Sequence, residues 1–410
     1  MALRSAVALG INLRSESKDT TDSSKEIRYR VWWSLHTLED TLAIMTGRPS
    51  NAASGFSTTP LPVPFDEEQF HVSPASTLLS DFKSRSSYLQ SLMTRKSAIY
   101  NTDNLLKPKV SEKQTSTSGF IHTPNISSYF LYFVNLTSIL RRSIDVLYSP
   151  RSETKTWSFL TITMVDLLAQ TDVWLETLPD LFHFSQITSQ LFVRQRWSLA
   201  FRFYSTRITI SRPSLCRRDR LVAREKDSGT GSLDVAEICI NSASAMLSLL
   251  PDSPDTLWLI EVSPWWCILH YLVQAITVLL LELEFCRKRQ FVTMDRIEPH
   301  LNKGLDWLLA LSLNDLAAER ALAACKDLHA RILMNTTVSP VSLSHMHASH
   351  SKSSYASSTG LSFQNAHDSH DSQPLHTSEE FAGRIMHPAK MTVHDEYMTG
   401  ETRIDCSNSV

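Results

Sequence analysis

Glycine is scarce in this sequence, with 10 among 410 residues, and no two of the six cysteines are close enough to form a C-x-x-C pair. Because β-rich chains use glycine at turns and bulges, its scarcity favours helices. The dispersed cysteines offer no zinc site built from pairs that are local in sequence. With no recognisable signal peptide, they indicate a reducing compartment, the cytosol or the nucleus.

A surplus of basic residues is also missing, because 40 Lys and Arg face 42 Asp and Glu. A domain that contacts DNA usually carries such a surplus. No P-loop, G-x-G-x-x-G, G-x-S-x-G or H-E-x-x-H motif occurs. The histidine pairs His345/His347 and His367/His370 are read as solvated residues rather than metal ligands. The sequence therefore predicts no catalytic residue, no metal ligand and no enzyme.

The most apolar run is Ile268 to Leu281, and the charged residues Glu282 and Glu284 follow it at once. A membrane-spanning helix needs about 20 apolar residues. The run is read as a buried core helix, and no contact with a membrane is predicted.

What is abundant is apolar spacing at three- and four-residue steps, which is typical of helices. We therefore predict an all-α fold, an irregular multi-helix regulatory domain with long loops and a disordered C-terminal tail. The expected helices cover residues 1–13, 25–46, 76–100, 125–147, 156–178, 185–210 (ended by Arg212-Pro213), 233–250, 264–288, 292–311 and 314–335.

The domain organisation follows from changes in composition. We predict that residues 1–335 form one helical domain. Residues 50–124 of this domain are loop-rich and contain a segment that resembles an insertion. Residues 336–410 are rich in Ser, His, Thr and Asp and lack apolar periodicity. They cannot bury enough surface to offset chain entropy, so we expect a disordered tail.

The most informative text begins at Glu26 and leaves its helix at Gly47-Arg48-Pro49. It predicts a helix with an apolar stripe and two adjacent tryptophans, which contact different neighbours. The guanidinium groups can stack on the tryptophans, as the spacings of four and three residues allow. A well-packed helix with satisfied arginines is preferred over a ligand-contacting role. The stripe is Val31, Leu35, Leu38, Leu42 and Met45, and the stacking pairs are Arg28 with Trp32 and Arg30 with Trp33.

As a pattern, this text resembles the fungal-specific transcription factor domain, the middle homology region of the binuclear zinc cluster regulators. Tyr29 departs from the first arginine of the family's R-R-x-W-W helix, and Arg28 beside it can take that place. The matching positions are Arg30, Trp32, Trp33, Gly47, Arg48 and Pro49, with weaker matches at Trp174 to Pro179, Ser211-Arg212-Pro213, Pro264-Trp265-Trp266 and His270-Tyr271, so that the resemblance spans roughly 2–335.

The resemblance implies a nuclear regulator of RNA polymerase II transcription. The family's zinc cluster, linker and coiled coil are not in this sequence, so the domain is expected to be truncated at its N-terminus or to act without its own DNA-binding part. No cofactor is expected in this chain, since the zinc belongs to the missing cluster. DNA is then a partner only through a missing domain or another protein, and a homo- or heterodimer is compatible with the family.

A small-molecule effector is the other implied partner, because helical proteins commonly form apolar cavities between helices. Trp265, Trp266 and His270 are the candidate walls of such a pocket, although core packing is the preferred interpretation of both tryptophans. Two alternatives stay open: a helical scaffold or cofactor that does not bind DNA, and an enzyme whose site is assembled from distant residues.

Overall fold

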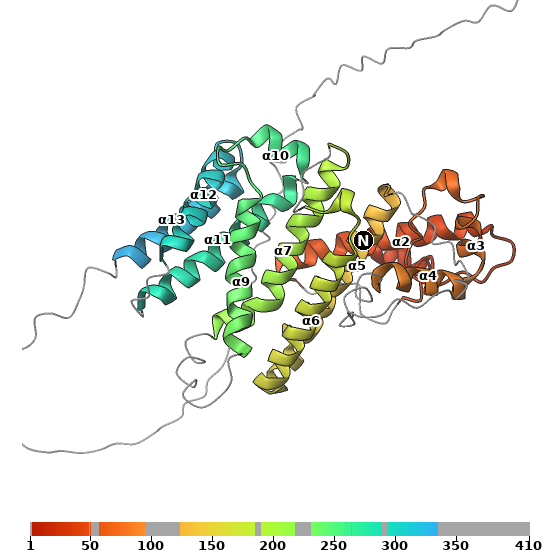
Figure 1. The fold of residues 1–410 in the computed structure, drawn as a ribbon, viewed down its shortest axis with the longest axis horizontal. Coiled ribbons are helices and arrows are strands. Elements are labelled where there is room, and N and C mark those ends of the chain that lie inside the picture. The colour runs from red at the N-terminus through yellow and green to blue at the C-terminus, as the bar shows by residue number, and fades with distance from the viewer. Residues whose placement is uncertain are drawn as a thin grey trace, which may run out of the picture. The chain divides into compact units, whose positions relative to one another are not determined.

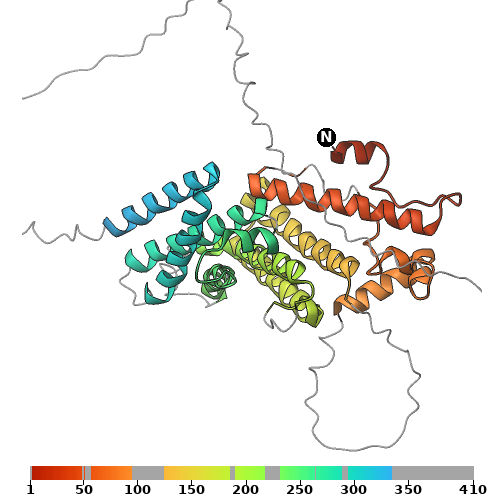
Figure 2. The same ribbon diagram turned by 90° about the horizontal axis from the view of Figure 1, so that it is seen from above.

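The computed structural model describes residues 2–48, 50, 57–94, 124–184, 190–217, 231–263, 265–288 and 294–334. These residues contain α-helices and short 3-10 helices and no strand (Figures 1 and 2), which confirms the all-α prediction. Residues 95–123 of the stretch predicted to be loop-rich (50–124), Pro49 and the predicted tail of 336–410 lie outside the described residues. The boundary between the domain and its tail stays a prediction.

Most helices match the expected ranges, but the first ends at Ala8 rather than at residue 13, and the one expected over 185–210 runs from Val193 to Cys216. One further helix, α10, lies in a stretch for which no helix was predicted. The range 76–100 contains two short helices rather than one. The α-helices are α1 (Ala2–Ala8), α2 (Asp22–Thr46), α3 (Ala75–Ser80), α4 (Phe82–Thr94), α5 (Ile126–Leu147), α6 (Trp157–Thr177), α7 (Val193–Cys216), α9 (Gly231–Ser248), α10 (Thr256–Val262), α11 (Trp265–Lys288), α12 (Met294–Ser312) and α13 (Leu316–Met334). The 3-10 helices are η1 (Glu67–Gln69), η2 (Pro150–Thr154) and η3 (Asp180–Phe182).

Helix α7 separates two hydrophobic cores and contributes to both. Phe201 and Ile208 face a core shared with α9, α11, α12 and α13. Leu199 and Phe203 face a second core shared with α5 and α6. In Figure 1, α12 and α13 lie at one end of the domain and α2 to α4 at the other, with α7 between them. Substitutions in α7 therefore reach both halves.

Helix α11 is long and apolar enough to cross a membrane on length and composition, which corrects the expectation that its apolar run is too short. Of its most apolar window, within Cys267–Cys286, 67% is buried inside the domain. The prediction of a buried core helix is therefore confirmed.

Helix α2 ends at Thr46 as predicted and begins at Asp22, three residues before the predicted start. The Thr21 side chain accepts a hydrogen bond from the Ser24 backbone, which is a normal N-cap. Gly47 ends the helix with φ of 65°, a left-handed conformation that glycine adopts without strain.

The predicted apolar stripe of α2 is not its buried face. Val31, Leu38 and Leu42 are between 43% and 46% exposed, whereas Glu26 and Asp40 are fully buried. Buried polar groups are stable only with partners, and both carboxylates have them, as described below. Tertiary contacts therefore decide the orientation of this helix against its own hydrophobic periodicity.

Helix α7 does not end at Arg212-Pro213 as expected but continues through Pro213 to Cys216. Proline lacks an N–H, so the carbonyl of Thr209, four residues earlier, loses its helical partner. The Tyr148 hydroxyl donates a hydrogen bond to that carbonyl at 2.6 Å. Burial raises the pKa of Tyr148 to about 12, which keeps the hydroxyl protonated and able to donate.

Replacing Tyr148 with phenylalanine should therefore lower the free energy of unfolding by about 1–3 kcal/mol, the cost of a buried carbonyl without a partner. Urea denaturation of the full chain measures it. In a Pro213→Ala background the new N–H can bond to Thr209, so the same substitution should cost clearly less. Equal costs in both backgrounds would contradict this account.

Candidate functional site

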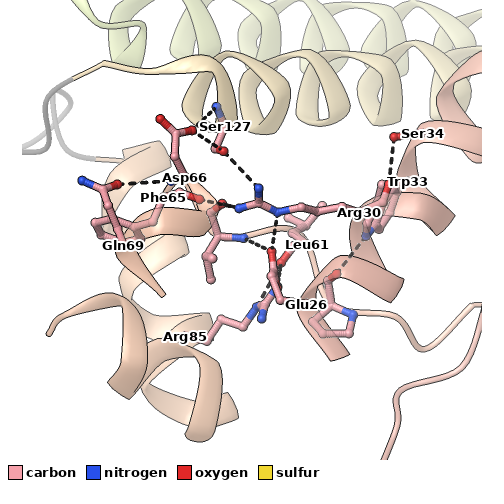
Figure 3. Close-up of polar contacts among 12 residues, drawn as sticks. Glu26, Arg30, Trp33, Ser34, Leu61, Phe65, Asp66, Gln69, Arg85 and Ser127 are labelled. Atoms are coloured by element: carbon pink, nitrogen blue, oxygen red, sulfur yellow. Dashed lines mark hydrogen bonds and ion pairs between the residues drawn. The ribbon is translucent and has the colours of Figure 1, made fainter. Parts of the chain in front are cut away.

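The start of helix α2 carries a buried ion cluster, shown in Figure 3. Glu26 is fully buried and pairs with Arg85 of α4 at 2.6 Å and with Arg30 at 3.2 Å. It also accepts the backbone N–H of Val63 at 2.9 Å. Arg85 in turn donates to the Leu61 carbonyl at 3.0 Å. One carboxylate thus holds the proline-rich segment, residues 60–64, against two helices.

Arg30 extends this cluster to α5. Its guanidinium donates to the Phe65 carbonyl and to the Ser127 hydroxyl, the latter at 3.1 Å. Ser127 donates onward to Asp66 at 2.7 Å (Figure 3). The predicted stacking of Arg30 on a tryptophan is wrong, because the guanidinium lies over the Phe70 ring at 4.9 Å. All these contacts join parts of one domain.

The neighbouring motif residues also make contacts within the domain. Arg28 donates to the carbonyls of Leu9 and Gly10, at 2.9 and 2.6 Å, just after α1. The Trp33 indole donates to the Pro60 carbonyl at 2.8 Å. These bonds tie the segments on either side of α2 to its surface, where Figure 2 shows α1 alongside.

Trp32 is 2% exposed and packs against Leu3 and Ala6 of α1. Trp33 also packs against this cluster, and both rings contact His36, with ring centroids 5.7 Å apart for Trp32 and 5.3 Å apart for Trp33. The prediction that the two tryptophans contact different neighbours is therefore wrong for these contacts. Arg28 makes its bonds to backbone carbonyls, and no stacking on Trp32 is seen among the described contacts. In this structure the start of the motif helix contacts neighbouring segments of the chain.

A second buried carboxylate lies further along α2. Asp40 is fully buried and contacts His36 at 3.1 Å and Arg141 of α5 at 3.3 Å. The Ser50 hydroxyl donates to it at 2.8 Å, beyond the helix exit. Arg141 also pairs with Asp145 at 2.9 Å. This cluster fixes the end of α2 against α5.

The exit of α2 opens on a cavity of about 480 Å³, called the exit cavity here. Ligand pockets commonly measure about 300–1,000 Å³. The cavity lies between the end of α2, α5, η2, α7 and α11. Its lining residues are Ala43, Ile44, Gly47, Arg48, Ser50, Arg141, Ile144, Asp145, Tyr148, Ser149, Pro150, Thr209, Arg212, His270 and Gln274.

This cavity is lined by three residues that the sequence predicts as site residues: Gly47, Arg48 and His270. The first two belong to the motif exit, and His270 belongs to the predicted effector pocket. Burial, followed by the charges of Arg202 and Arg212, lowers the pKa of His270 to about 4. The imidazole is therefore neutral at physiological pH, and its Nε2 atom is buried with no partner among the described residues. The side chains of Trp265 and Trp266 lie outside the described part of the structure.

Sequence reasoning missed Arg202, a buried cation beside this cavity. It is 2% exposed, donates to the hydroxyls of Thr41 and Thr137 at 2.6 and 3.2 Å, and lies 5.1 Å from the centre of the Phe133 ring. Its Nε atom has no partner in the described structure. Its position between Phe201 and Phe203 in the sequence indicates that Arg202 is buried. Nothing in the neighbouring sequence indicates that its guanidinium has no carboxylate partner.

A smaller, more apolar cavity of about 170 Å³ lies between α2, α5, α7 and α11. Thr41 and Phe133, both contacts of Arg202, line it, as do Tyr271 and Ser263. An engineered apolar cavity of about 150 Å³ holds benzene, so this space fits only a small group.

Within the described ranges, no group of three or more His, Cys, Asp or Glu side chains is placed to hold a metal ion. Cys239, Cys267, Cys286 and Cys325 are buried free thiols. The histidine pairs of residues 345–370 lie outside those ranges. The described residues thus form two buried ion clusters, around Glu26 and Asp40, and a cavity lined by more arginines than carboxylates.

Comparisons with known proteins agree with this picture. Residues 1–178 match the profile of the fungal specific transcription factor domain. The chain is 31% identical over 369 residues to the transcription regulator galc of Aspergillus niger, covering 81% of this chain and 43% of that protein. It is 36% identical over 62 residues to an uncharacterized transcriptional regulatory protein of Schizosaccharomyces pombe, covering 15% of this chain and 8% of that one.

The chain thus spans less than half the length of the curated relatives it matches. No solved structure matches it. The profile match contains the motif helix and its exit, the residues that first indicated the resemblance. Residues 1–178 of this chain are thus similar to the fungal specific transcription factor domain.

Proposed function

We propose that this chain is the regulatory region of a nuclear transcription regulator, acting on RNA polymerase II genes. The exit cavity is its effector site, and DNA contact comes from another segment or a partner protein. The observation that carries the proposal is the position of the cavity. It opens at the exit of the family's motif helix and is lined by four further elements from both halves of the domain.

The position suggests how an effector could act. Arg141 lines the cavity and also holds the buried carboxylate of Asp40. Tyr148 lines it and supports the proline-interrupted turn of α7. A ligand in the cavity therefore contacts groups that hold α2, α5 and α7 together. Such a ligand shifts their packing only through a difference in affinity between two arrangements.

The experiment fuses the full chain to a heterologous DNA-binding domain and measures a reporter gene in fungal cells. The fusion should change reporter output several-fold relative to the DNA-binding domain alone. Ile144→Trp, which fills the exit cavity, should alter that response at equal nuclear protein level. Ile162→Trp is the matched control, because Ile162 is 67% exposed on α6 and does not line the cavity.

Output equal to that of the DNA-binding domain alone would contradict the regulatory role. Equal output from the two tryptophan variants and the wild type would contradict the role of the cavity. A second measurement concerns DNA itself. The purified chain should not shift DNA at physiological salt, since its charge is nearly balanced. Tight, salt-sensitive binding would contradict the proposal that DNA contact comes from another segment or a partner protein.

A further inference from the structure

The lining of the exit cavity is unbalanced in charge. Arg48, Arg141 and Arg212 line it together with the carboxylate of Asp145, and the buried carboxylate of Asp40 contacts Arg141 from behind the wall, which leaves an excess of one positive charge. His270 adds none, because its imidazole is neutral. A guanidinium keeps its charge in proteins. The cavity therefore favours a ligand of negative charge.

The three lining arginines differ in how far their charge is already compensated. Arg141 is held by Asp40 and Asp145, at 3.3 and 2.9 Å. Among the residues that the structure describes, neither Arg48 nor Arg212 has a carboxylate partner. Arg212 instead lies over the Tyr148 ring at 5.1 Å. The charges of these two guanidinium groups are thus not compensated by a carboxylate in the described part of the chain.

Arg202 is a further cation, which contacts two lining residues of the smaller cavity and reaches the exit cavity only through its charge. It is buried, and its described partners are hydroxyl groups and an aromatic ring, which carry no negative charge. Its charge acts on His270, which lines the cavity. A buried charge without a counter-charge is costly, and an anion in the cavity would reduce that cost.

The remaining wall defines the rest of the ligand. Ile44, Ile144 and Pro150 are apolar, and the Nε2 atom of His270 is a buried polar group without a partner among the described residues. Such a group gains from a ligand atom that can bond to it. The volume of about 480 Å³ accommodates a metabolite-sized molecule.

We propose that the exit cavity binds a small organic anion, a carboxylate or a phosphate ester with an apolar body. Arg48 and Arg212 hold the anionic group, Arg202 adds long-range attraction, and His270 bonds to a polar atom of the ligand. This inference names the chemical class of the effector and rests on the proposed function. The fixed charges of the cavity carry it.

The test uses the purified full chain and four probes at millimolar concentration: benzoate, phenyl phosphate, inorganic phosphate and the neutral benzamide. Calorimetry and the shift in melting temperature report binding, with chloride added to equal ionic strength. Benzoate or phenyl phosphate should bind and benzamide should not. The preferred anion separates a carboxylate from a phosphate effector, and binding of inorganic phosphate alone would show that no apolar body is recognised and overturn the proposal.

Arg48→Gln and Arg212→Gln should each weaken binding of the preferred probe by about tenfold, as expected for loss of a charged hydrogen bond. Both residues are exposed, so the variants should fold. Arg142→Gln is the matched control, because Arg142 is an exposed arginine of α5 that pairs with Asp166 away from the cavity. Equal binding of benzamide and benzoate, or unchanged binding by the double variant, would overturn the proposal.

The two proposals fail separately. A fusion that regulates the reporter while the chain binds neither organic anion would overturn the anion site and leave the regulatory role. If the chain binds the anion through Arg48 and Arg212 but the fusion leaves the reporter unchanged, the regulatory role is overturned and the anion site stands.

Discussion

Replacing Glu26 with alanine should lower the free energy of unfolding by about 3–5 kcal/mol, the range for removing one partner of a buried ion pair. Glu26 is fully buried, and Arg85, its partner at 2.6 Å, is 3% exposed. The substitution leaves this guanidinium without its carboxylate and the Val63 N–H without its acceptor. Because a domain is stable by only about 5–15 kcal/mol, much of the chain should unfold at moderate urea concentration.

Urea denaturation of the full chain, followed by circular dichroism, measures this loss. Asp327→Ala is the control, because it breaks an exposed pair with Arg331 on α13 and should cost less than about 1 kcal/mol. A double variant, Glu26→Met with Arg85→Met, should recover part of the stability, since it removes the buried guanidinium of Arg85 and leaves only the less buried Arg30 without its carboxylate. A loss below about 1 kcal/mol for Glu26→Ala would show that this cluster does not hold the proline-rich segment.

The ends of α2 could be predicted because their signals are local. Thr21 caps the first turn, and Gly47 adopts the left-handed conformation at the last. The burial of Glu26 could not be predicted, because its partners Val63 and Arg85 lie 37 and 59 residues along the chain. The hydrophobic pattern even favoured the opposite face. Ion clusters of this kind form between residues that are far apart in the chain, and a single sequence does not show which of them come into contact.

The error at Pro213 has the same origin. Proline usually ends a helix because one carbonyl loses its partner. Here a tyrosine from the end of α5 supplies that partner to Thr209. Because Tyr148 is distant in sequence from Pro213, the rule that proline ends a helix predicts the wrong C-terminal end for α7.

The candidate site was predicted in pieces. Arg48 entered through the motif exit and His270 through the expected effector pocket, and the structure brings both to one cavity. Arg212 was noted only within a weak match at the end of a helix. The charge imbalance depends on which arginines already have acids beside them, as Arg141 does. That information exists only in three dimensions.

The neutral histidine in the exit cavity gives the second large effect, a loss of stability in mild acid. His270 has a pKa of about 4 in the folded protein against 6.5 in the unfolded chain. The unfolded chain therefore binds a proton first as the pH falls below 6.5, and the folded state loses stability until its own pKa is reached. This one group should remove about 2 kcal/mol between pH 7.5 and pH 5.

Urea denaturation of wild type and His270→Gln at both pH values isolates that contribution, because the other ionisable groups are common to both proteins. The wild type should lose about 2 kcal/mol more than the variant over this interval. Arg202 and Arg212 both lower this pKa, whereas the acid on the same wall, Asp145, is paired with Arg141. Parallel losses in the two proteins would mean that His270 is protonated as easily in the fold as outside it. Because burial is the largest cause of the low pKa and the two arginines add to it, that result would contradict both the burial of His270 and its positive surroundings.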